Sequence, residues 1–455
     1  MVVVFVLVAL LVVGVLVTSN WYVWRRLFRD TTRGPGPARR IGAALIAGGW
    51  VLAVGALVAE RAGAPFWLQR VLAWPGFLWL ALSIYLLLAV LAGEVVRPLL
   101  RRYLEHRAAA RQAEPQPSGS PAADPERIPA GTAPPKTSHT PDAPSTPDAP
   151  DTPKTRDTRD TPSSGDTPSP GNDAPPTSLA LPSRRLFVSR VVAGAAAAAA
   201  VGTVGYGTYG VLSGPKVKRV TVPLAKLPRA AHGFRIAVVS DIHLGPVLGR
   251  GFAQQVVDTI NATQPDLIAV VGDLVDGSVK DLGPAAAPLA QLKARHGAYF
   301  VTGNHEYFSG AEQWVAEVRR LGLLPLENAR TELPHFDLAG VNDVAGEDEG
   351  QGPDYAKALG DRDRSRACVL LAHQPVQIHD AVDHGVDLQL SGHTHGGQLW
   401  PGNLIAGAAN PTLAGLDRYG DTQLYVSRGA GAWGPPTRVG APSDITVIEL
   451  ASRKA

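Results

Sequence analysis

The stretch Leu388-Gln389-Leu390-Ser391-Gly392-His393-Thr394-His395-Gly396-Gly397-Gln398 decides the fold expected for the C-terminal half of this 455-residue chain. Its apolar beginning predicts a short buried strand, and its glycines predict a turn that backbone or a ligand can approach closely. Residues two apart in an extended chain point to the same side, so His393 and His395 can face one site. Neutral imidazole is a common ligand of transition metals. Two histidines in a surface turn are the plain alternative.

Four further apolar segments end in polar residues of the same class. Residues 234–240, 267–271, 298–301 and 368–371 predict strands that end at Asp241 and His243, at Asp273, at Asn304 and His305, and at His373. Ligands of α/β sheets gather at the carboxyl ends of strands. Aspartate and asparagine also favour turns, but the agreement of five strand ends indicates a metal site.

The segments between these strands complete the expected domain. Residues 251–263 and 284–295 predict helices, so residues 216–452 are expected to form a layered α/β domain. The single cysteine, Cys368, lies in an apolar run and is expected to be a buried thiol rather than a nucleophile.

The number and type of candidate ligands limit which metal ions the site can hold. Two carboxylates, one amide and four imidazoles, with His305 set apart, are more than one tetrahedral ion needs. They suit two divalent ions that share a carboxylate. Oxygen and nitrogen ligands without thiolates suit Mn²⁺, Fe or Zn²⁺.

A resemblance to the calcineurin-like metallophosphoesterases is carried by Asp241-Ile242-His243, Gly272-Asp273, Gly303-Asn304-His305-Glu306, Ala372-His373 and Gly392-His393-Thr394-His395. The residues that flank these motifs resemble those of the bacterial membrane-associated branch of that family. The resemblance implies an α/β fold, a metallophosphoesterase-type layered β-sandwich flanked by helices, here preceded by an all-α transmembrane region.

The same resemblance assigns roles by position. It gives one metal ion Asp241, His243 and His395, and it gives the other Asn304, His373 and His393. Asp273 would bridge the two ions. His305 would contact the phosphoryl oxygen or protonate the leaving group, and Asp276 would orient His305, with a loop-capping aspartate as the alternative. The implied reaction is hydrolysis of a phosphodiester or phosphomonoester by a hydroxide that bridges the two ions.

Two late arginines and one tryptophan are weaker candidates. Arg428 and Arg438 follow late strands and could hold phosphate through bidentate contacts, although a structural role is more common for such arginines. Trp433 lies in a glycine-rich stretch and is expected to line or cover the cleft.

The N-terminal part, residues 1–112, predicts three transmembrane helices. The apolar runs are 2–19, 41–59 and 71–93, each close to the ~20 residues that span a bilayer. Arginines crowd the segments 25–40 and 97–111, and the positive-inside rule places both in the cytoplasm. The N-terminus is therefore expected outside.

A linker and a fourth apolar segment follow. Residues 113–183 are rich in Pro, Thr and Asp and predict a disordered linker. Residues 184–213 read equally as a fourth transmembrane segment or as a twin-arginine-like signal anchor, because Arg184 and Arg185 precede a mildly apolar run. Both interpretations predict a multi-pass cell-membrane protein with an extracytoplasmic catalytic domain.

These observations together predict a dinuclear-metal phosphoesterase, a hydrolase held at a membrane. Its partner would be a phosphoester substrate, with an envelope phospholipid as one candidate and a soluble phosphoester as another. A formal net charge of +3 gives no support for nucleic-acid binding. A non-catalytic membrane receptor or scaffold with a metallophosphoesterase-like domain is the alternative.

Overall fold

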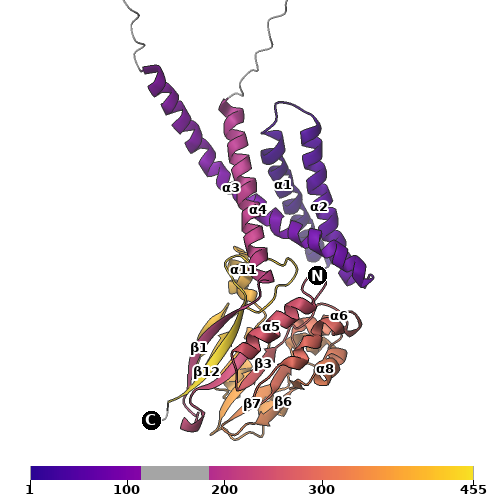
Figure 1. Cartoon of the computed structure of the whole chain (residues 1–455), viewed down its shortest axis with the longest axis vertical. Helices are drawn as coiled ribbons and strands as arrows, with labels where there is room; N and C mark the ends of the chain where they lie inside the picture. Colours follow the sequence, from indigo (N-terminus) through magenta and orange to yellow (C-terminus); the bar gives the residue numbers. More distant parts are fainter. Residues whose placement is uncertain (1, 114–183, 454–455) are drawn as a thin grey trace, which may run out of the picture. The chain divides into compact units, whose positions relative to one another are not determined.

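The computed structural model describes residues 2–113 and 184–453. The predicted linker lies outside the described residues, apart from its first residue, Ala113, at which a helix ends. Figure 1 labels the elements along the described chain.

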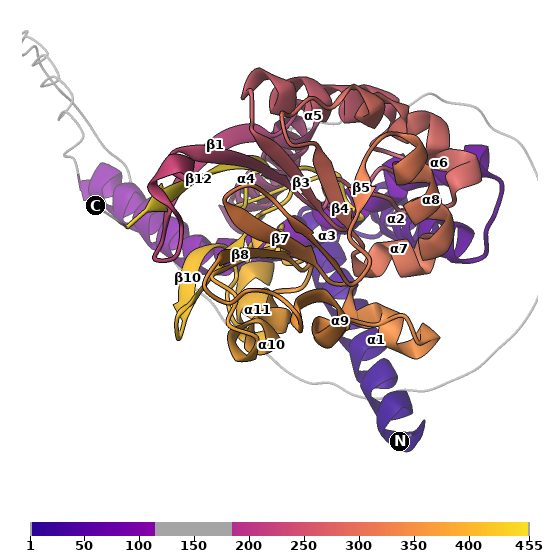
Figure 2. The ribbon, with the colours of Figure 1, turned by 90° about the horizontal axis from the view of Figure 1, so that it is seen from below.

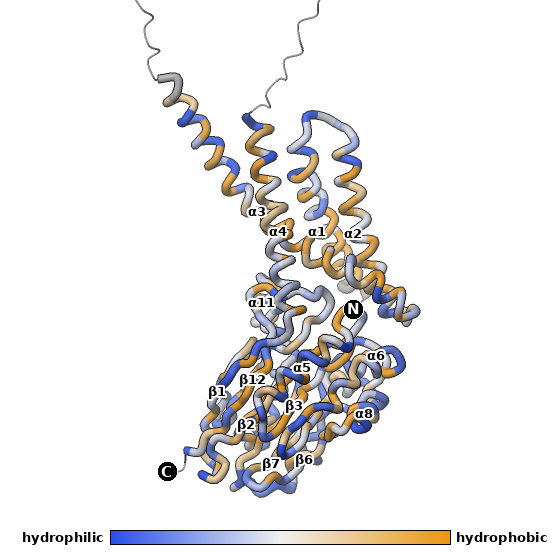
Figure 3. The backbone as a smooth tube through the Cα atoms, viewed as in Figure 1, coloured by the Kyte–Doolittle hydropathy of each residue, from blue (hydrophilic) through white to orange (hydrophobic). Residues whose placement is uncertain are grey.

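Four long helices precede the sheets in sequence. They are α1 (Val2–Trp24), α2 (Pro37–Arg61), α3 (Phe66–Ala113) and α4 (Arg184–Leu212), with a π-helical turn, Arg25–Arg29, after α1. Within the described part of the chain, these four are long and apolar enough to cross a membrane, and Figure 3 shows hydrophobic residues along them. They contain the four predicted apolar segments and indicate a membrane protein. The side of the membrane and the twin-arginine-like signal stay predictions.

The residues after α4 form two six-stranded sheets. The first has the order β1 (Lys216–Leu224), β12 (Asp444–Ser452), β2 (Phe234–Val239), β3 (Leu267–Val271), β4 (Ala298–Val301) and β5 (Leu324–Pro325). The second has the order β10 (Gly415–Tyr419), β11 (Thr422–Val426), β9 (Leu388–Ser391), β8 (Ala367–Leu371), β7 (Phe336–Gly340) and β6 (Ala329–Glu332). Both sheets are mixed, with parallel central strands.

The main core lies between the two sheets. Along β2, Ile236 and Val238 pack with side chains of the second sheet, whereas Ala237 and Val239 pack with the outer helices. The alternation follows from the two-residue period of a strand, and both faces of β2 are covered. Cys368, on β8, is buried as expected, and burial raises the pKa of its thiol to about 12.

Helices cover the outer faces of the sheets (Figure 2). The remaining helices are α5 (Arg250–Ala262), α6 (Val279–Ala286), α7 (Asn304–Ser309), α8 (Ala311–Arg320), α9 (Tyr355–Leu359), α10 (Ile378–Asp383) and α11 (Gly402–Ala409). α5, α6 and α8 contribute to the core beside the first sheet, and α9 and α10 to the core beside the second. These findings confirm the predicted layered β-sandwich flanked by helices.

The helix predicted over 284–295 was wrong in its bounds. The α-helix α6 begins five residues earlier, at Val279, and passes at Ala287 into a 3-10 turn that ends at Gln291. Its start is fixed by Ser278, whose hydroxyl accepts a hydrogen bond from the backbone N–H of Asp281 at 3.3 Å. Pro288 has no N–H to donate to the preceding turn, which favours the change of helix type there.

Hydrogen bonds connect the membrane helices to the sheet domain. The hydroxyl of Tyr85, on α3, donates to the carbonyl of Trp400 at 2.9 Å. The hydroxyls of Thr208, on α4, and Thr437 are 2.7 Å apart. The segment after His393 and His395 is therefore tied to α3 through Trp400, and the later segment around Thr437 is tied to α4.

Candidate metal centre

Every candidate ligand lies just after a strand. Asp241 and His243 follow β2, Asp273 follows β3, Asn304 begins α7 after β4, His373 follows β8, and His393 and His395 follow β9. β2, β3 and β4 are parallel neighbours in one sheet, and β8 and β9 are parallel neighbours in the other. The carboxyl ends of these strands meet, and the candidate ligands come within reach of one another.

The first group of ligands consists of Asp241, His243 and His395, all buried. The Nε2 atoms of His243 and His395 are 3.0 Å apart, and His395 Nε2 is 3.4 Å from Asp241 Oδ1. Burial lowers the pKa of His395 well below its usual value, and His243 and Arg438 lower it further. A neutral ring is the form that binds a metal.

The second group consists of Asp273, His373 and His393. His373 Nε2 is 3.1 Å from Asp273 Oδ2. The amide oxygen of Asn304 lies 3.0 Å from Nδ1 of His393, so Asn304 joins this group. The structure thus places His393 beside Asn304 and His373, in a different group from His395.

One oxygen of Asp273 lies between the two groups. Asp273 Oδ2 is 3.1 Å from His373 Nε2 and 3.7 Å from His243 Nε2. The other oxygen, Oδ1, accepts a hydrogen bond from the backbone N–H of His305 at 2.9 Å. Asp273 is therefore placed where a carboxylate shared by two ions would be needed.

Two buried polar atoms test whether the site fits a metal. Asp241 Oδ2 and His373 Nε2 are buried and have no hydrogen-bond partner among the described residues. His373 Nδ1 is 2.8 Å from the carbonyl of Val271, to which it donates, so the lone pair of the neutral ring is on Nε2. Leaving such atoms unsatisfied is costly, and a divalent cation would satisfy both.

Asp276 contacts two histidines through the same atom. Its Oδ1 is 2.9 Å from Nδ1 of His243 and 2.7 Å from Nδ1 of His305. Burial disfavours the charged carboxylate, yet the neighbouring His243 and His305 lower the pKa of Asp276 to about 2. Burial likewise disfavours charged His305, but its hydrogen bond to Asp276 raises its pKa to about 9. Asp276 contacts His305, the residue it was expected to orient, and also a candidate metal ligand.

The backbone around the ligands is unusual. Among the described non-glycine residues, eight have a positive φ, and five of these are candidate ligands: Asp241, His243, Asp273, His393 and His395. Such a left-handed conformation costs about 1–3 kcal/mol each when a non-glycine residue adopts it. Strain concentrated at one place indicates a functional site, because the surrounding structure must hold the ligands against it.

Glu306 is a residue whose role the sequence did not reveal. Its buried carboxylate accepts backbone hydrogen bonds from Gly303, Asp273 and Leu274 at 2.6, 2.9 and 2.8 Å. It ties the turn after β3 to the turn after β4. Burial raises the pKa of Glu306 to about 7, and the charge of Asp273 acts in the same direction. The motif contains Glu306 and Gly303, but two of the backbone groups that Glu306 binds, those of Asp273 and Leu274, are distant in sequence.

Arg438 is not placed to hold substrate. Its guanidinium is buried and donates to the carbonyls of Gly431, His395 and Ala441 at 2.7, 3.0 and 3.1 Å. A further nitrogen is 3.1 Å from Nδ1 of His395. The structural interpretation therefore holds for Arg438, which positions His395. Arg428 packs against Gly396, because a Cβ atom added to Gly396 would lie 3.0 Å from the Arg428 side chain.

Apolar side chains surround His305 at the edge of the site. Its ring centroid is 5.5 Å from that of Phe308 and 5.6 Å from that of Trp433, and these two side chains are 76% and 52% exposed. Glu60 and Phe77, from α2 and α3, line a small cavity together with His243 and Asp276. The membrane helices thus reach the candidate metal centre.

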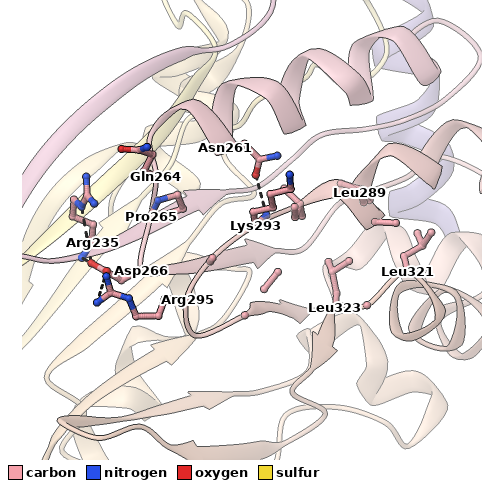
Figure 4. A pocket seen from close by; sticks show the side chains of 16 residues that line it. Arg235, Asn261, Gln264, Pro265, Asp266, Leu289, Lys293, Arg295, Leu321 and Leu323 are labelled. Atoms are coloured by element: carbon pink, nitrogen blue, oxygen red, sulfur yellow. Dashed lines mark hydrogen bonds and ion pairs between the residues drawn. The ribbon is translucent and has the colours of Figure 1, made fainter.

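A larger cavity lies elsewhere (Figure 4). It has a volume of about 870 Å³ and is lined by residues at the amino ends of β2, β3 and β4, including Arg235, Asp266 and Ala298. Asp266 Oδ1 is 3.6 Å from the guanidinium of Arg295 there. None of the candidate ligands lines this cavity, so its size gives it no part in the metal centre.

Comparisons with known proteins agree with this geometry. The profile of the family "Calcineurin-like phosphoesterase" matches residues 234–397. A "Transmembrane protein with metallophosphoesterase domain" from Danio rerio is 39% identical over 259 residues, which cover 54% of this chain and 59% of that protein. An "Uncharacterized metallophosphoesterase" from Helicobacter pylori is 38% identical over 273 residues, 59% of this chain and 73% of that protein.

A shorter bacterial relative is matched almost throughout. An "Uncharacterized metallophosphoesterase" from Bacillus subtilis is 31% identical over 280 residues, which cover 59% of this chain and 98% of that protein. The match with the Danio rerio protein spans less than two thirds of its length. The profile match, these identities and the ligands assembled at five strand ends show that the chain belongs to the calcineurin-like phosphoesterase family.

Proposed function

We propose that this chain is a metal-dependent phosphoesterase that hydrolyses a phosphodiester or phosphomonoester at a membrane surface. The observation that carries the proposal is the position of Asp273 Oδ2 between His373, at 3.1 Å, and His243, at 3.7 Å. This arrangement favours two divalent ions with one shared carboxylate. Such ions would lower the pKa of water and polarise a phosphoryl oxygen.

The chain's own residues supply the rest of the chemistry. The two groups would hold the ions and thereby position the phosphoryl group. His305, kept protonated by Asp276, can donate a hydrogen bond to a phosphoryl oxygen or give its proton to the leaving oxygen. Glu306 and Arg438 contact no substrate in this proposal, because they fix the ligand-bearing turns through the backbone and His395.

The surroundings of His305 favour a lipid phosphoester as the substrate. Exposed Phe308 and Trp433 flank its ring, and Phe77, from α3, lines a small cavity together with Asp276, the partner of His305. A phosphoester with an apolar tail would place its phosphate at the metal centre and its tail against these side chains. A soluble phosphoester would make no use of them.

Hydrolysis by the purified full-length protein with added Mn²⁺ tests the catalytic proposal. The substrates are bis(p-nitrophenyl) phosphate and p-nitrophenyl phosphate. Asp273→Ala should lower kcat/KM by about a thousandfold, because metal ions contribute several kcal/mol of transition-state stabilisation. Asp421→Ala, an exposed carboxylate in the turn between β10 and β11, is the matched control and should keep full activity. Equal rates for native protein and Asp273→Ala on both substrates would support a non-catalytic receptor or scaffold instead.

A second comparison tests the lipid substrate. The double variant Phe308→Ala/Trp433→Ala should lose activity on phosphatidic acid in mixed micelles about tenfold or more, since two large apolar contacts are removed. Its activity on p-nitrophenyl phosphate should change little. Equal losses on both substrates would show that the two aromatic side chains act on His305 and not on a lipid tail.

A further inference from the structure

A second cavity lies among the helices, lined by arginines from the turn after α1 and from α2, α3 and α4. Its volume is about 410 Å³, and eight arginine side chains line it together with one carboxylate, Asp30. We call it the arginine cavity. It shares no lining residue with the candidate metal centre.

The positive charge of the arginine cavity is only partly balanced. Arg26 pairs with Asp30 at 2.9 Å and with Glu94 at 2.7 Å, and Arg97 pairs with Glu94 at 3.2 Å. In the described part of the chain, no hydrogen bond or ion pair is made by the side chains of three other lining arginines: Arg29, Arg101 and Arg185. Like charges gathered from separate elements repel one another, so the cavity has room and charge for an anion.

Some of the lining arginines have a buried Nε atom without a hydrogen-bond partner, whereas Arg29 and Arg185 are exposed. Arg97 is only 7% exposed, and its Nε has no hydrogen-bond partner. The Nε atoms of Arg26 and Arg101 are also buried without a partner among the described residues. A buried guanidinium nitrogen without an acceptor is costly, and phosphate oxygens match the guanidinium geometry.

The walls of the cavity are held in place by contacts between elements distant in sequence. Arg190, on α4, donates through Nε to the carbonyl of Thr31 at 3.0 Å. Arg39, on α2, donates through Nε to the hydroxyl of Thr32 at 2.7 Å. The arginine cluster is therefore a built site and not a set of independent surface charges.

The neighbourhood of the cavity indicates what kind of anion it takes. Val96 precedes the lining residue Arg97 on α3, Phe187 follows the lining residue Leu186 on α4, and both are exposed. The guanidinium of Arg25 lies 5.5 Å from the ring of Trp21, and tryptophan is typical of the interface between membrane and water. A ligand here would meet arginines with its head and apolar side chains with its tail.

We propose that the arginine cavity binds the phosphate of an anionic phospholipid, as a site separate from the metal centre. Basic cavities between membrane helices suit such headgroups, and the guanidinium forks give hydrogen bonds as well as charge. A lipid bound there would join the turn after α1 to α3 and α4. The proposal does not depend on the phosphoesterase activity.

The test measures thermal unfolding of the full-length protein in a neutral detergent with EDTA present. Phosphatidylglycerol, phosphatidylcholine and inorganic phosphate are added separately. Phosphatidylglycerol should raise the unfolding midpoint of the native protein by several degrees, because it binds the folded state. Phosphatidylcholine and inorganic phosphate should raise it much less. Equal stabilisation by inorganic phosphate would show a free-anion site, and equal stabilisation by phosphatidylcholine would show no headgroup selection; either result overturns the proposal.

Two matched triple variants locate the effect. Arg29→Gln/Arg101→Gln/Arg185→Gln removes three lining arginines that hold no carboxylate, so no buried acid is left unpaired. It should lose most of the shift. Arg40→Gln/Arg102→Gln/Arg184→Gln removes the same charge from three exposed arginines that do not line the cavity, and it should keep the shift. Equal losses in the two variants would show a general charge effect and refute the site.

A milder variant covers the case in which the first triple does not fold. Arg101→Lys keeps the charge but replaces the guanidinium fork by a single ammonium group. Native mass spectrometry of the protein extracted from membranes should show phosphatidylglycerol retained by the native protein, with at least a severalfold lower retained fraction for Arg101→Lys. Equal retention would count against the arginine cavity.

Discussion

Asp273 and Asp276 lie three residues apart and face different partners. Asp273 Oδ2 lies between the two ligand groups. Asp276 Oδ1, in contrast, lies within hydrogen-bond distance of Nδ1 of His243 and of Nδ1 of His305. Asp276 thereby fixes the orientation of a candidate metal ligand and of the candidate acid together. A change at Asp276 should disturb both, while a change at His305 should affect only proton transfer or phosphate contact.

His305→Ala tests the role of the candidate acid. If His305 protonates the leaving oxygen, the variant should lose about 10²–10⁴-fold in kcat on an alkyl phosphoester. It should lose far less on a p-nitrophenyl ester, whose leaving group needs no proton. Equal losses on both substrates would instead indicate that His305 contacts the phosphoryl oxygen. Metal content, measured alongside, should stay at the native value.

His393 and His395 should affect different metal positions. His395 lies with Asp241 and His243, and His393 lies with Asp273 and His373. Sites of this kind hold two ions. His393→Ala and His395→Ala should therefore each lower the bound Mn²⁺ by about one ion per chain. Combining both should remove both ions. Mass spectrometry of metal content is the measurement, and a native content of one ion would show a mononuclear site.

The turn after β9 is the element that joins the two ligand groups. It carries one histidine of each group and places both in a left-handed conformation. Its approach to the turn after β2 is close, because the N–H of His393 donates to Asp241 Oδ1 at 2.9 Å. The turn can make this contact only because residue 392 has no side chain.

Gly392→Ala should therefore weaken metal binding without removing any ligand. A Cβ at this position would collide with Asp241 Oδ2 and lie 2.6 Å from Cβ of Ser240. We expect a large loss of Mn²⁺ affinity with the sheet structure retained, checked by titration calorimetry and circular dichroism. Gly251→Ala is the control, since nothing lies within 4 Å of its Cβ on α5. Native affinity in Gly392→Ala would show that the turn can move.

At the scale of the whole molecule, arginines from the turn after α1 and from α2, α3 and α4 line one cavity, while the metal centre is reached by α2 and α3 through Glu60 and Phe77. Arginines beside membrane spans favour the cytoplasmic side, so the sheet domain is expected outside.

Fusions with two reporters test this topology. Alkaline phosphatase joined after Ala455 should be active, and a fluorescent protein joined there should be dark, because the first needs an oxidising compartment to fold and the second fails when exported unfolded. Fusions after Ala113, at the end of α3, should give the opposite pattern. A fluorescent C-terminal fusion that is protected from protease added outside the membrane would place the catalytic domain in the cytoplasm, whereas one that the protease releases would indicate export in the folded state, as a twin-arginine-like signal predicts.

The sequence by itself determined the five strands that precede the candidate ligands, the ligand types and the four long apolar helices. Period and composition are local properties, and apolar strands that end in Asp, Asn or His can be recognised without knowing their neighbours. The resemblance to a family then grouped Asp241 with His395 and His373 with His393, in advance of any geometry.

Only the tertiary structure decided which groups support the ligands. Glu306 binds the backbone of the turn after β3, Arg438 contacts His395, and Asp276 contacts His243 in addition to His305. The gathering of arginines from separate helices in one cavity has the same origin. Contacts of this kind depend on how turns approach one another in space, and neither residue type nor spacing along the chain encodes that approach.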